Sequence, residues 1–282
     1  MSAIVTLTTD FGLSDAYVAA MKGVILGINP GVRLVDICHT VRPRNIAQAA
    51  FVLSTAYRFF PVGTIHLVVV DPGVGSERRS VILKTSSACF VAPDNGVLSY
   101  IVEQFSPGPD PAETGSLTER QLGPELEAIA ITRPQFWRSP VSPTFHGRDI
   151  FAPVAAHLSL GQPPCDFGEP ITSLKVLTLT RPWRKPDGSM VGNILHIDVF
   201  GNLITSIRCQ DVLPITGTLV TEVGGRVISG LVNTYTEGEG LLTLFGSSGY
   251  LEISLRDGSA RDVLGADAGD EVIVQSLAGS QQ

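Results

Sequence analysis

The fold is best indicated by residues 64–75, Thr64-Ile65-His66-Leu67-Val68-Val69-Val70-Asp71-Pro72-Gly73-Val74-Gly75. The part before Asp71 is an almost continuous apolar run, and a glycine-rich turn follows it. Apolar runs of this length are typical of a strand inside a sheet that is covered on both faces. The sequence therefore predicts a buried strand at residues 64–70, with a polar turn at its carboxyl end.

The residues before this stretch alternate between strand and helix patterns. Strands are expected at residues 4–8 and 32–37, where short β-rich runs occur. Helices are expected at residues 15–28 and 46–60, because apolar side chains recur there at helical spacing and each segment ends in a signal that contains proline and glycine. A β-α-β-α-β order predicts a parallel sheet with right-handed crossovers.

The second half of the chain has a different pattern. Residues 106–124 are rich in proline, glycine and acidic residues, so we expect a surface loop there, and a helix is expected near residues 148–158. From about residue 192 the helical pattern ends, and short β-type runs alternate with turn residues. We therefore predict an α/β domain with a mainly parallel sheet at residues 1–180 and a small all-β, barrel-like domain at residues 187–282.

The composition is that of a globular protein and excludes some classes of partner. The chain has 282 residues, of which 44% are hydrophobic and 17% charged, with a formal net charge of -7. An acidic chain is a poor ligand for nucleic acid, and the apolar runs are too short to span a membrane. No secretion signal is recognised, so we expect a cytoplasmic protein. The four widely spaced cysteines (38, 89, 165 and 209) predict buried free thiols.

Four polar segments containing glycine interrupt the apolar framework. Each is compatible with ordinary turn chemistry when taken alone. However, Asp10 and Asp71 both follow predicted parallel strands, and ligands bind beyond the carboxyl ends of such strands. We therefore expect these two carboxylates to converge. The segments are residues 8–12 with Asp15, residues 71–78, residues 93–96 and residues 144–149.

Asp71, Arg78 and His146 could together activate water. Asp71 and Arg78 can meet across their glycine-rich loop, where the guanidinium would keep the carboxylate ionised. A histidine can accept a proton near neutral pH. The alternative is that Asp71 and Arg78 form an ion pair that only fastens the loop. The sequence contains no Gly-x-Ser-x-Gly motif that would indicate an acyl-enzyme.

The β-rich half contains a second candidate site at residues 198–202, Asp198-Val199-Phe200-Gly201-Asn202. Asp198 could bind an amine, Phe200 could stack on a flat ring, and Asn202 could form hydrogen bonds with the edge of that ring. A plain β-hairpin turn explains the same residues. The sequence leaves both interpretations open.

Six ordered motifs resemble the S-adenosyl-L-methionine (SAM) hydrolase family, also described as SAM hydroxide adenosyltransferases, which is related to the bacterial fluorinase and chlorinase. The resemblance covers nearly the whole chain. The motifs are Thr-Asp-Phe-Gly-x-x-Asp at 9–15, Asp-Pro-Gly-Val-Gly-x-x-Arg at 71–78, Pro-Asp-Asn-Gly at 93–96, Phe-His-Gly-Arg-Asp at 145–149, Asp-x-Phe-Gly-Asn at 198–202 and Ser-x-Gly-Tyr-Leu-Glu at 247–252.

The resemblance implies an N-terminal α/β domain, a C-terminal β-barrel and a homotrimer with sites at subunit boundaries. It implies that the substrate is SAM, without a metal or another cofactor. Asp71, Arg78 and His146 would form the catalytic triad. Asp10 would hold the ribose, Asp15 and Asp198 the methionine portion, and Phe200 and Asn202 the adenine. The further substrate-binding residues would be Asn95, Ser247, Ser248, Glu252 and Ala260.

The implied reaction is attack of water on the ribose 5′ carbon, which gives adenosine and L-methionine. Arg78 would position the attacking oxygen, while His146 and Asp71 would share or relay its proton. The chain departs from many relatives at Gly246-Ser247-Ser248, where an Asn-Ser pair is expected. Halogenating members of the family lack the Asp-Arg-His set, so its presence favours water over halide.

Three alternatives remain at this point. The first is a halide-using SAM transferase of the same fold. The second is a non-catalytic SAM- or adenosine-binding protein. The third is a metal-dependent phosphoesterase built on Asp10, Asp71, Asn95, His146 and Asp149, although only one of these is a histidine and no His-x-His or Asp-x-His pair supports a metal cluster.

Overall fold

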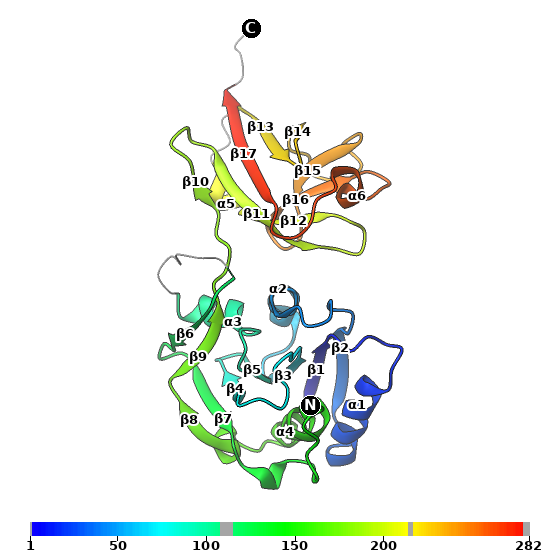
Figure 1. Ribbon diagram of the computed structural model, residues 1–282, viewed down its shortest axis with the longest axis vertical. Helices are drawn as coiled ribbons and strands as arrows, with labels where there is room; N and C mark the ends of the chain where they lie inside the picture. The colour runs from blue at the N-terminus through cyan, green and yellow to red at the C-terminus, as the bar shows by residue number, and fades with distance from the viewer. Residues whose placement is uncertain (1, 108–114, 214–216, 279–282) are drawn as a thin grey trace. The chain divides into compact units, whose positions relative to one another are not determined.

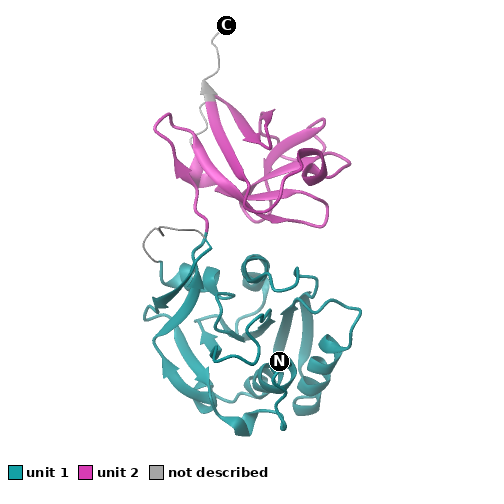
Figure 2. Ribbon diagram, viewed as in Figure 1, with its two compact units in different colours: residues 1–179 teal, residues 180–282 magenta. Residues whose placement is uncertain are grey.

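The computed structural model describes residues 2–107, 115–213 and 217–278, which form two compact units. The first unit is Met1–Leu179 and the second is Thr180–Gln282 (Figure 2). Each unit has its own hydrophobic core.

The first unit is built on a sheet with the strand order β2-β1-β3-β5-β4-β7-β8 (Figure 1). One half of the sheet is parallel and consists of β2 (Arg33–Cys38), β1 (Ile4–Thr9), β3 (Thr64–Val69) and β5 (Ala88–Pro93). The parallel arrangement of β1, β2 and β3 confirms the prediction from the sequence. The other half is antiparallel: β4 (Ser80–Lys84), β7 (Glu127–Ile131) and β8 (Gly168–Ile171). Because β1 and β3 are direct neighbours, the turns that follow them lie side by side.

The buried strand β3 explains the apolar run that indicated the fold. Leu67 and Val69 belong to the core on one face of the sheet, whereas Val68 and Val70 belong to the core on the other face. Each face is covered by helices. The first face carries α1 (Tyr17–Ile28) and α4 (Ala152–Ser159), and the second carries α2 (Ile46–Ala56) and α3 (Ser99–Phe105).

Three segments differ from the sequence-based expectation. The helix expected at residues 46–60 ends at Ala56 and continues as a 3-10 turn at Tyr57–Phe59, and the helix expected near 148–158 is preceded by a π-helical turn at Gly147–Phe151. Within the expected loop 106–124, β6 (Leu117–Gln121) pairs antiparallel with β9 (Ser173–Leu177). Its side chains are mostly exposed, so no apolar pattern indicates this strand. Residues 108–114 lie outside the described residues. Short 3-10 turns occupy Pro134–Phe136 and Pro164–Phe167.

The second unit is an antiparallel, nearly closed sheet, which confirms the predicted all-β, barrel-like fold. Its strand order is β14-β13-β17-β11-β12-β16-β15, with β10 paired to β11. The segment that follows the edge strand β14 is bonded to the other edge strand, since Val232 N donates to Thr243 O at 2.9 Å. The elements are β10 (Trp183–Arg184), β11 (Met190–Ile197), β12 (Leu203–Arg208), α5 (Cys209–Val212), β13 (Gly217–Val223), β14 (Arg226–Ser229), β15 (Leu241–Phe245), β16 (Tyr250–Leu255), α6 (Ala260–Leu264) and β17 (Glu271–Ala278).

Among the described residues, none of the helices is both long and apolar enough to cross a membrane. The four cysteines are free thiols, as the sequence predicts, but the expectation that they are buried is wrong: Cys165 is exposed, and Cys38, Cys89 and Cys209 are half-buried.

Candidate active site

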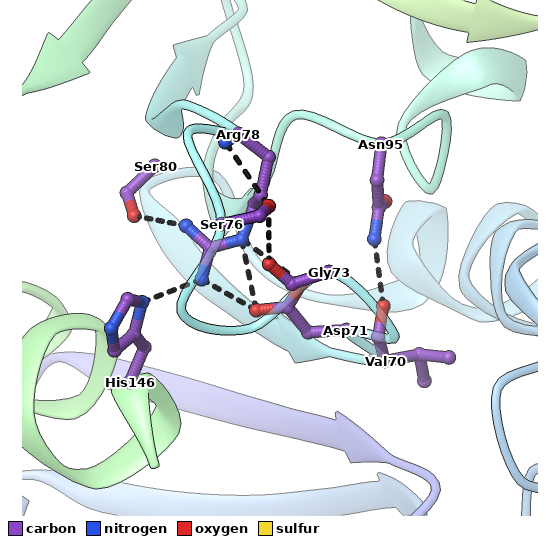
Figure 3. Close-up of polar contacts among 8 residues, drawn as sticks. All are labelled: Val70, Asp71, Gly73, Ser76, Arg78, Ser80, Asn95 and His146. Atoms are coloured by element: carbon purple, nitrogen blue, oxygen red, sulfur yellow. Dashed lines mark hydrogen bonds and ion pairs between the residues drawn. The ribbon is translucent and has the colours of Figure 1, made fainter. Parts of the chain in front are cut away.

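Asp71 and Arg78 lie in the loop that joins β3 to β4 (Figure 3). Arg78 Nε donates to both carboxylate oxygens of Asp71, at 2.9 and 3.0 Å, and Nη2 donates to Oδ2 at 2.5 Å. Both side chains are almost fully buried, with exposed fractions of 7% for Arg78 and 4% for Asp71. A buried guanidinium and carboxylate in this paired geometry form a strong, directional interaction.

His146 contacts the same guanidinium from a different part of the chain. Its Nδ1 lies 2.8 Å from Arg78 Nη2 (Figure 3). A guanidinium is only a donor, so Nδ1 must carry the lone pair and the proton of the neutral imidazole must lie on Nε2. Partial burial, followed by the positive charge of Arg78, lowers the pKa of His146, while Asp71 and Asp149 oppose this shift. His146 is therefore held neutral, as the Nε2–H tautomer.

Arg78 retains one N–H group that the protein does not use. A guanidinium has five N–H donors. Four of them are engaged. Nε donates to Asp71, Nη2 donates one hydrogen to Asp71 and one to His146, and Nη1 donates one hydrogen to Ser80 Oγ at 2.8 Å. The described part of the chain provides no partner for the second hydrogen on Nη1. The ring of Phe151 lies under the guanidinium, 5.2 Å from its Cζ.

The segment that carries His146 is held by Asp149, whose side chain is fully buried. Arg148 binds both carboxylate oxygens, at 2.7 and 2.8 Å, and Ser142 N donates to Oδ2 at 2.9 Å. Burial alone would raise the pKa of Asp149, but these hydrogen bonds keep it below its ordinary value. The same segment closely approaches the Asp71 loop at Gly75, where an added Cβ would lie 2.5 Å from Pro143 O.

Asp10 and Asp15 belong to the turn after β1, next to the end of β3. Asp10 Oδ2 accepts a hydrogen bond of 2.7 Å from the backbone N–H of Arg44. Arg44 has a φ of 66°, the left-handed region that non-glycine residues seldom adopt. Asp15 is exposed just before α1. The structure therefore brings Asp10 to the sheet edge where Asp71 lies.

Asn95 is nearly buried, and its side chain is bonded to the backbone. Its Nδ2 donates to Val70 O at 2.9 Å (Figure 3), and its Oδ1 accepts from Val97 N at 3.2 Å. Its neighbour Asp94 is paired with Arg79. Both residues thus contact segments that flank the Asp71–Arg78 loop.

The second unit contains a pocket of about 570 Å³ that includes Asp198, Phe200 and Asn202. Asp198 shapes the turn, because its Oδ1 accepts from the N–H groups of Phe200 and Asn202 at 2.9 Å. Its Oδ2 accepts from Asn202 Nδ2 at 2.9 Å. The Phe200 ring is left 72% exposed. The remaining lining residues are Tyr235, Thr236, Leu255, Arg256, Asp257 and Gly258.

Other predicted binding residues lie in the same unit. Glu252, buried on β16, accepts a hydrogen bond of 2.6 Å from Tyr235 Oη, and burial followed by the Glu252 carboxylate raises the pKa of Tyr235. Ser247 and Ser248 form the turn between β15 and β16. Ala260 is buried at the start of α6.

The sequence did not indicate Ser80, Arg44 or Tyr235. Ser80 could have been found, because it lies two positions after Arg78 in an extended segment and side chains at that spacing share a face. Tyr235 had no such signal, since it reaches the pocket only through folding of the second unit. Among the described residues, no group of three or more His, Cys, Asp or Glu side chains is arranged to hold a metal ion.

Comparison with known proteins identifies relatives over nearly the whole length. The sequence model of the SAM hydroxide adenosyltransferase N-terminal domain matches residues 5–168, and that of the C-terminal domain matches residues 192–273. A Salinispora tropica protein named (R)-S-adenosyl-L-methionine hydrolase is 34% identical over 271 residues, which cover 96% of this chain and 97% of that protein. A Thermus thermophilus protein of the same name is 38% identical over 266 residues, covering 93% and 95%.

A more distant relative and a solved structure complete the comparison. A protein named fluorinase from Nocardia brasiliensis is 28% identical over 234 residues, which cover 74% of this chain and 72% of that protein. The crystal structure of an uncharacterized conserved protein from Thermotoga maritima has a TM-score of 0.84 at 34% identity, covering 96% of this chain and 99% of that chain. The matches to both domains and the full-length relatives show that this chain belongs to the SAM hydroxide adenosyltransferase family.

Proposed function

We propose that the protein hydrolyses S-adenosyl-L-methionine, with water attacking the ribose 5′ carbon to release adenosine and L-methionine. The observation that carries this proposal is the Arg78 guanidinium, which contacts Asp71 and His146 at once and keeps one N–H group for a ligand oxygen. Relatives named (R)-S-adenosyl-L-methionine hydrolase, similar over nearly the full chain, support the choice of substrate.

The chemistry of the substrate explains why such a site would suffice. A sulfonium makes methionine a good leaving group, so cleavage mainly requires an oxygen held in line behind the ribose 5′ carbon. Correct placement supplies up to roughly 7–11 kcal/mol, whereas a positioned base adds about 10²–10⁴ in rate. In this proposal Arg78 places the water through its remaining Nη1–H.

The geometry favours different roles for Asp71 and His146. His146 Nδ1 is occupied by Arg78, so His146 would donate a hydrogen bond through Nε2–H rather than accept the proton of the water. Asp71 would accept that proton, since its Oδ1 receives one hydrogen bond from the described residues, that of Arg78 Nε. The C5′–O bond forms while the C5′–S bond breaks, the electron pair leaves with methionine, and the proton goes to Asp71.

The remaining assignments belong to the same proposal. Asp10 would hold the ribose hydroxyls, and Asp15 and Asp198 the methionine portion. Phe200 and Asn202 would receive the adenine. The protein would be a cytoplasmic homotrimer whose active sites lie at subunit boundaries. Light scattering coupled to size exclusion tests the trimer. The other substrate contacts would come from Ser247, Ser248, Glu252 and Ala260.

Product analysis tests the proposed reaction. Incubation of the protein with SAM should release adenosine and L-methionine, and chromatography detects both. Arg78→Ala and His146→Ala should abolish the release of adenosine while leaving SAM binding largely intact. If adenosine never rises above the spontaneous breakdown of SAM, the protein is a SAM- or adenosine-binding protein instead.

A halide-using reaction is the second candidate, because more distant relatives are named fluorinase. Parallel incubations with chloride and with fluoride separate the two reactions. A 5′-halo-adenosine that forms only with halide would overturn the hydrolase proposal. Full activity in excess chelator would eliminate a metal-dependent phosphoesterase.

A further inference from the structure

We propose that Asp94 and Asn95 are positioning residues that clamp the two ends of the loop carrying Asp71 and Arg78, so that Asn95 acts on the reaction through the backbone rather than by binding substrate. The kinetic part of this inference rests on the proposed hydrolase function. The structural part does not.

Asn95 holds the N-terminal end of the loop. Its Nδ2 donates to the carbonyl of Val70, the residue directly before Asp71 (Figure 3), at 2.9 Å. Its Oδ1 accepts from Val97 N, and only 9% of the residue is exposed. A buried side-chain amide whose nitrogen and oxygen are both bonded to backbone is poorly placed to bind a ligand. It fixes the peptide from which the Asp71 side chain extends.

Asp94 holds the C-terminal end of the loop at Arg79, the residue directly after Arg78. Its Oδ2 accepts from Arg79 Nε at 2.7 Å, and its backbone N–H donates to Arg79 O at 2.9 Å. The adjacent arginines therefore have different roles: Arg78 contacts Asp71 and His146, whereas Arg79 anchors the backbone.

The clamp is itself fastened to β9. Asp94 Oδ1 accepts from Lys175 N at 2.8 Å, and Arg79 Nη2 donates to Ser173 O at 3.2 Å. Strand β9 lies in the same compact unit and pairs with β6. Two consecutive side chains thus tie both ends of the loop to the scaffold, and sites held by such supporting contacts keep the geometry that the chemistry requires.

The test uses Asn95→Ala with Asn193→Ala as the matched control. Asn193 makes the same kind of bond within the second unit, from Nδ2 to Gly269 O at 2.9 Å. Asp94→Asn is the second variant. It keeps the shape of the side chain but removes its charge opposite Arg79, so the proposal remains testable if Asn95→Ala does not fold.

Two readouts are made on each folded variant. Burial and then the charge of Arg78 lower the pKa of His146, and displacement of Arg78 removes the second of these causes. NMR titration of the His146 ring should therefore show a pKa that rises toward the ordinary value in Asn95→Ala and Asp94→Asn and that is unchanged in Asn193→Ala. With SAM, kcat should fall about 10-fold to 10²-fold while KM stays within about 3-fold, as expected for misplacement on the ångström scale.

The outcomes separate the two proposals. An unchanged His146 titration in both clamp variants overturns the clamp, as does a rise in KM at constant kcat, which would make Asn95 a substrate contact. If the wild-type protein releases no adenosine, the hydrolase proposal fails, and the His146 titration still decides the clamp.

Discussion

Arg78 Nη2 lies 2.8 Å from His146 Nδ1, and the same nitrogen donates to Asp71 Oδ2. One guanidinium therefore fixes both the position and the tautomer of the histidine. A protonated His146 would bring a second positive charge and an N–H group against the donor, so this contact exists only with neutral imidazole. The proposed activity should depend on pH through this contact.

The pH dependence follows from the lowered pKa of His146. Since burial and Arg78 lower that pKa, activity should stay level as the pH falls past about 6.5, the ordinary value for histidine, and decline only at more acidic pH. The contribution of His146 to the free energy of unfolding follows the same direction. It is fully present above the pKa of histidine in the unfolded chain and decreases as the pH falls toward the lower pKa of the folded protein. The pH profile of kcat checks this. His157→Gln, a control at another histidine whose pKa burial lowers, should leave the profile unchanged.

Gly75 allows the loop of Asp71 and the segment of His146 to approach each other. At Gly75 an added Cβ would lie 2.5 Å from Pro143 O, and φ is +80°. Gly188 has a φ of +86° with nothing within 4 Å of an added Cβ. Because L residues disfavour the left-handed conformation, alanine at either position should lower the free energy of unfolding by about 1–2 kcal/mol.

Only Gly75→Ala should also displace His146 and reduce kcat. Thermal unfolding and SAM turnover of both variants check this prediction. Equal activity in Gly75→Ala and Gly188→Ala would show that the close approach is unimportant for the reaction.

His66 should make the folded state sensitive to acid. It is fully buried in β3, its Nδ1 lies 2.8 Å from Thr6 Oγ1, and its ring stacks on Phe90 with centroids 5.1 Å apart. Burial lowers the pKa of His66 to about 4. Stability from neutral His66 is therefore fully present above about pH 6.5 and is lost as the pH falls toward 4, by roughly 3 kcal/mol.

His66→Gln removes this titration while keeping a partner for Thr6. Its free energy of unfolding, measured by urea denaturation at several pH values, should change less between pH 6.5 and 4 than that of the wild type. If the free energy of unfolding falls equally with pH in His66→Gln and in the wild type, other groups cause the acid sensitivity.

Phe200 should contribute to adenosine binding and little to stability. It lines the pocket and is 72% exposed, whereas its neighbour Val199 is 92% exposed and is not among the lining residues. Phe200→Ala should weaken binding of adenosine to the full-length protein by about 1–3 kcal/mol, the usual value of a base stacked on an aromatic ring. Val199→Ala serves as the control. Calorimetric titration compares them, and equal affinities would remove Phe200 from the site.

The apolar run of β3 allowed much of the fold to be predicted, because Leu67 and Val68 are buried on opposite faces and only a covered strand needs both. The exposed strand β6 was missed, since Glu119 and Arg120 carry no strand pattern. Local patterns also could not place His146, which lies 68 residues from Arg78. The family motifs grouped the two residues, but the tautomer of His146 follows only from the three-dimensional contact.

In the proposed reaction, water attacks the ribose 5′ carbon of SAM at Arg78, Asp71 and His146. The most direct measurement is mass spectrometry of the products formed in water enriched in oxygen-18. We expect the heavy isotope to enter the 5′-hydroxyl of adenosine, L-methionine to be unlabelled, and Arg78→Ala to form neither product above background. Adenosine without the heavy isotope would rule out attack by water on the ribose 5′ carbon, and labelled adenosine formed at an undiminished rate by Arg78→Ala would rule out the role of Arg78.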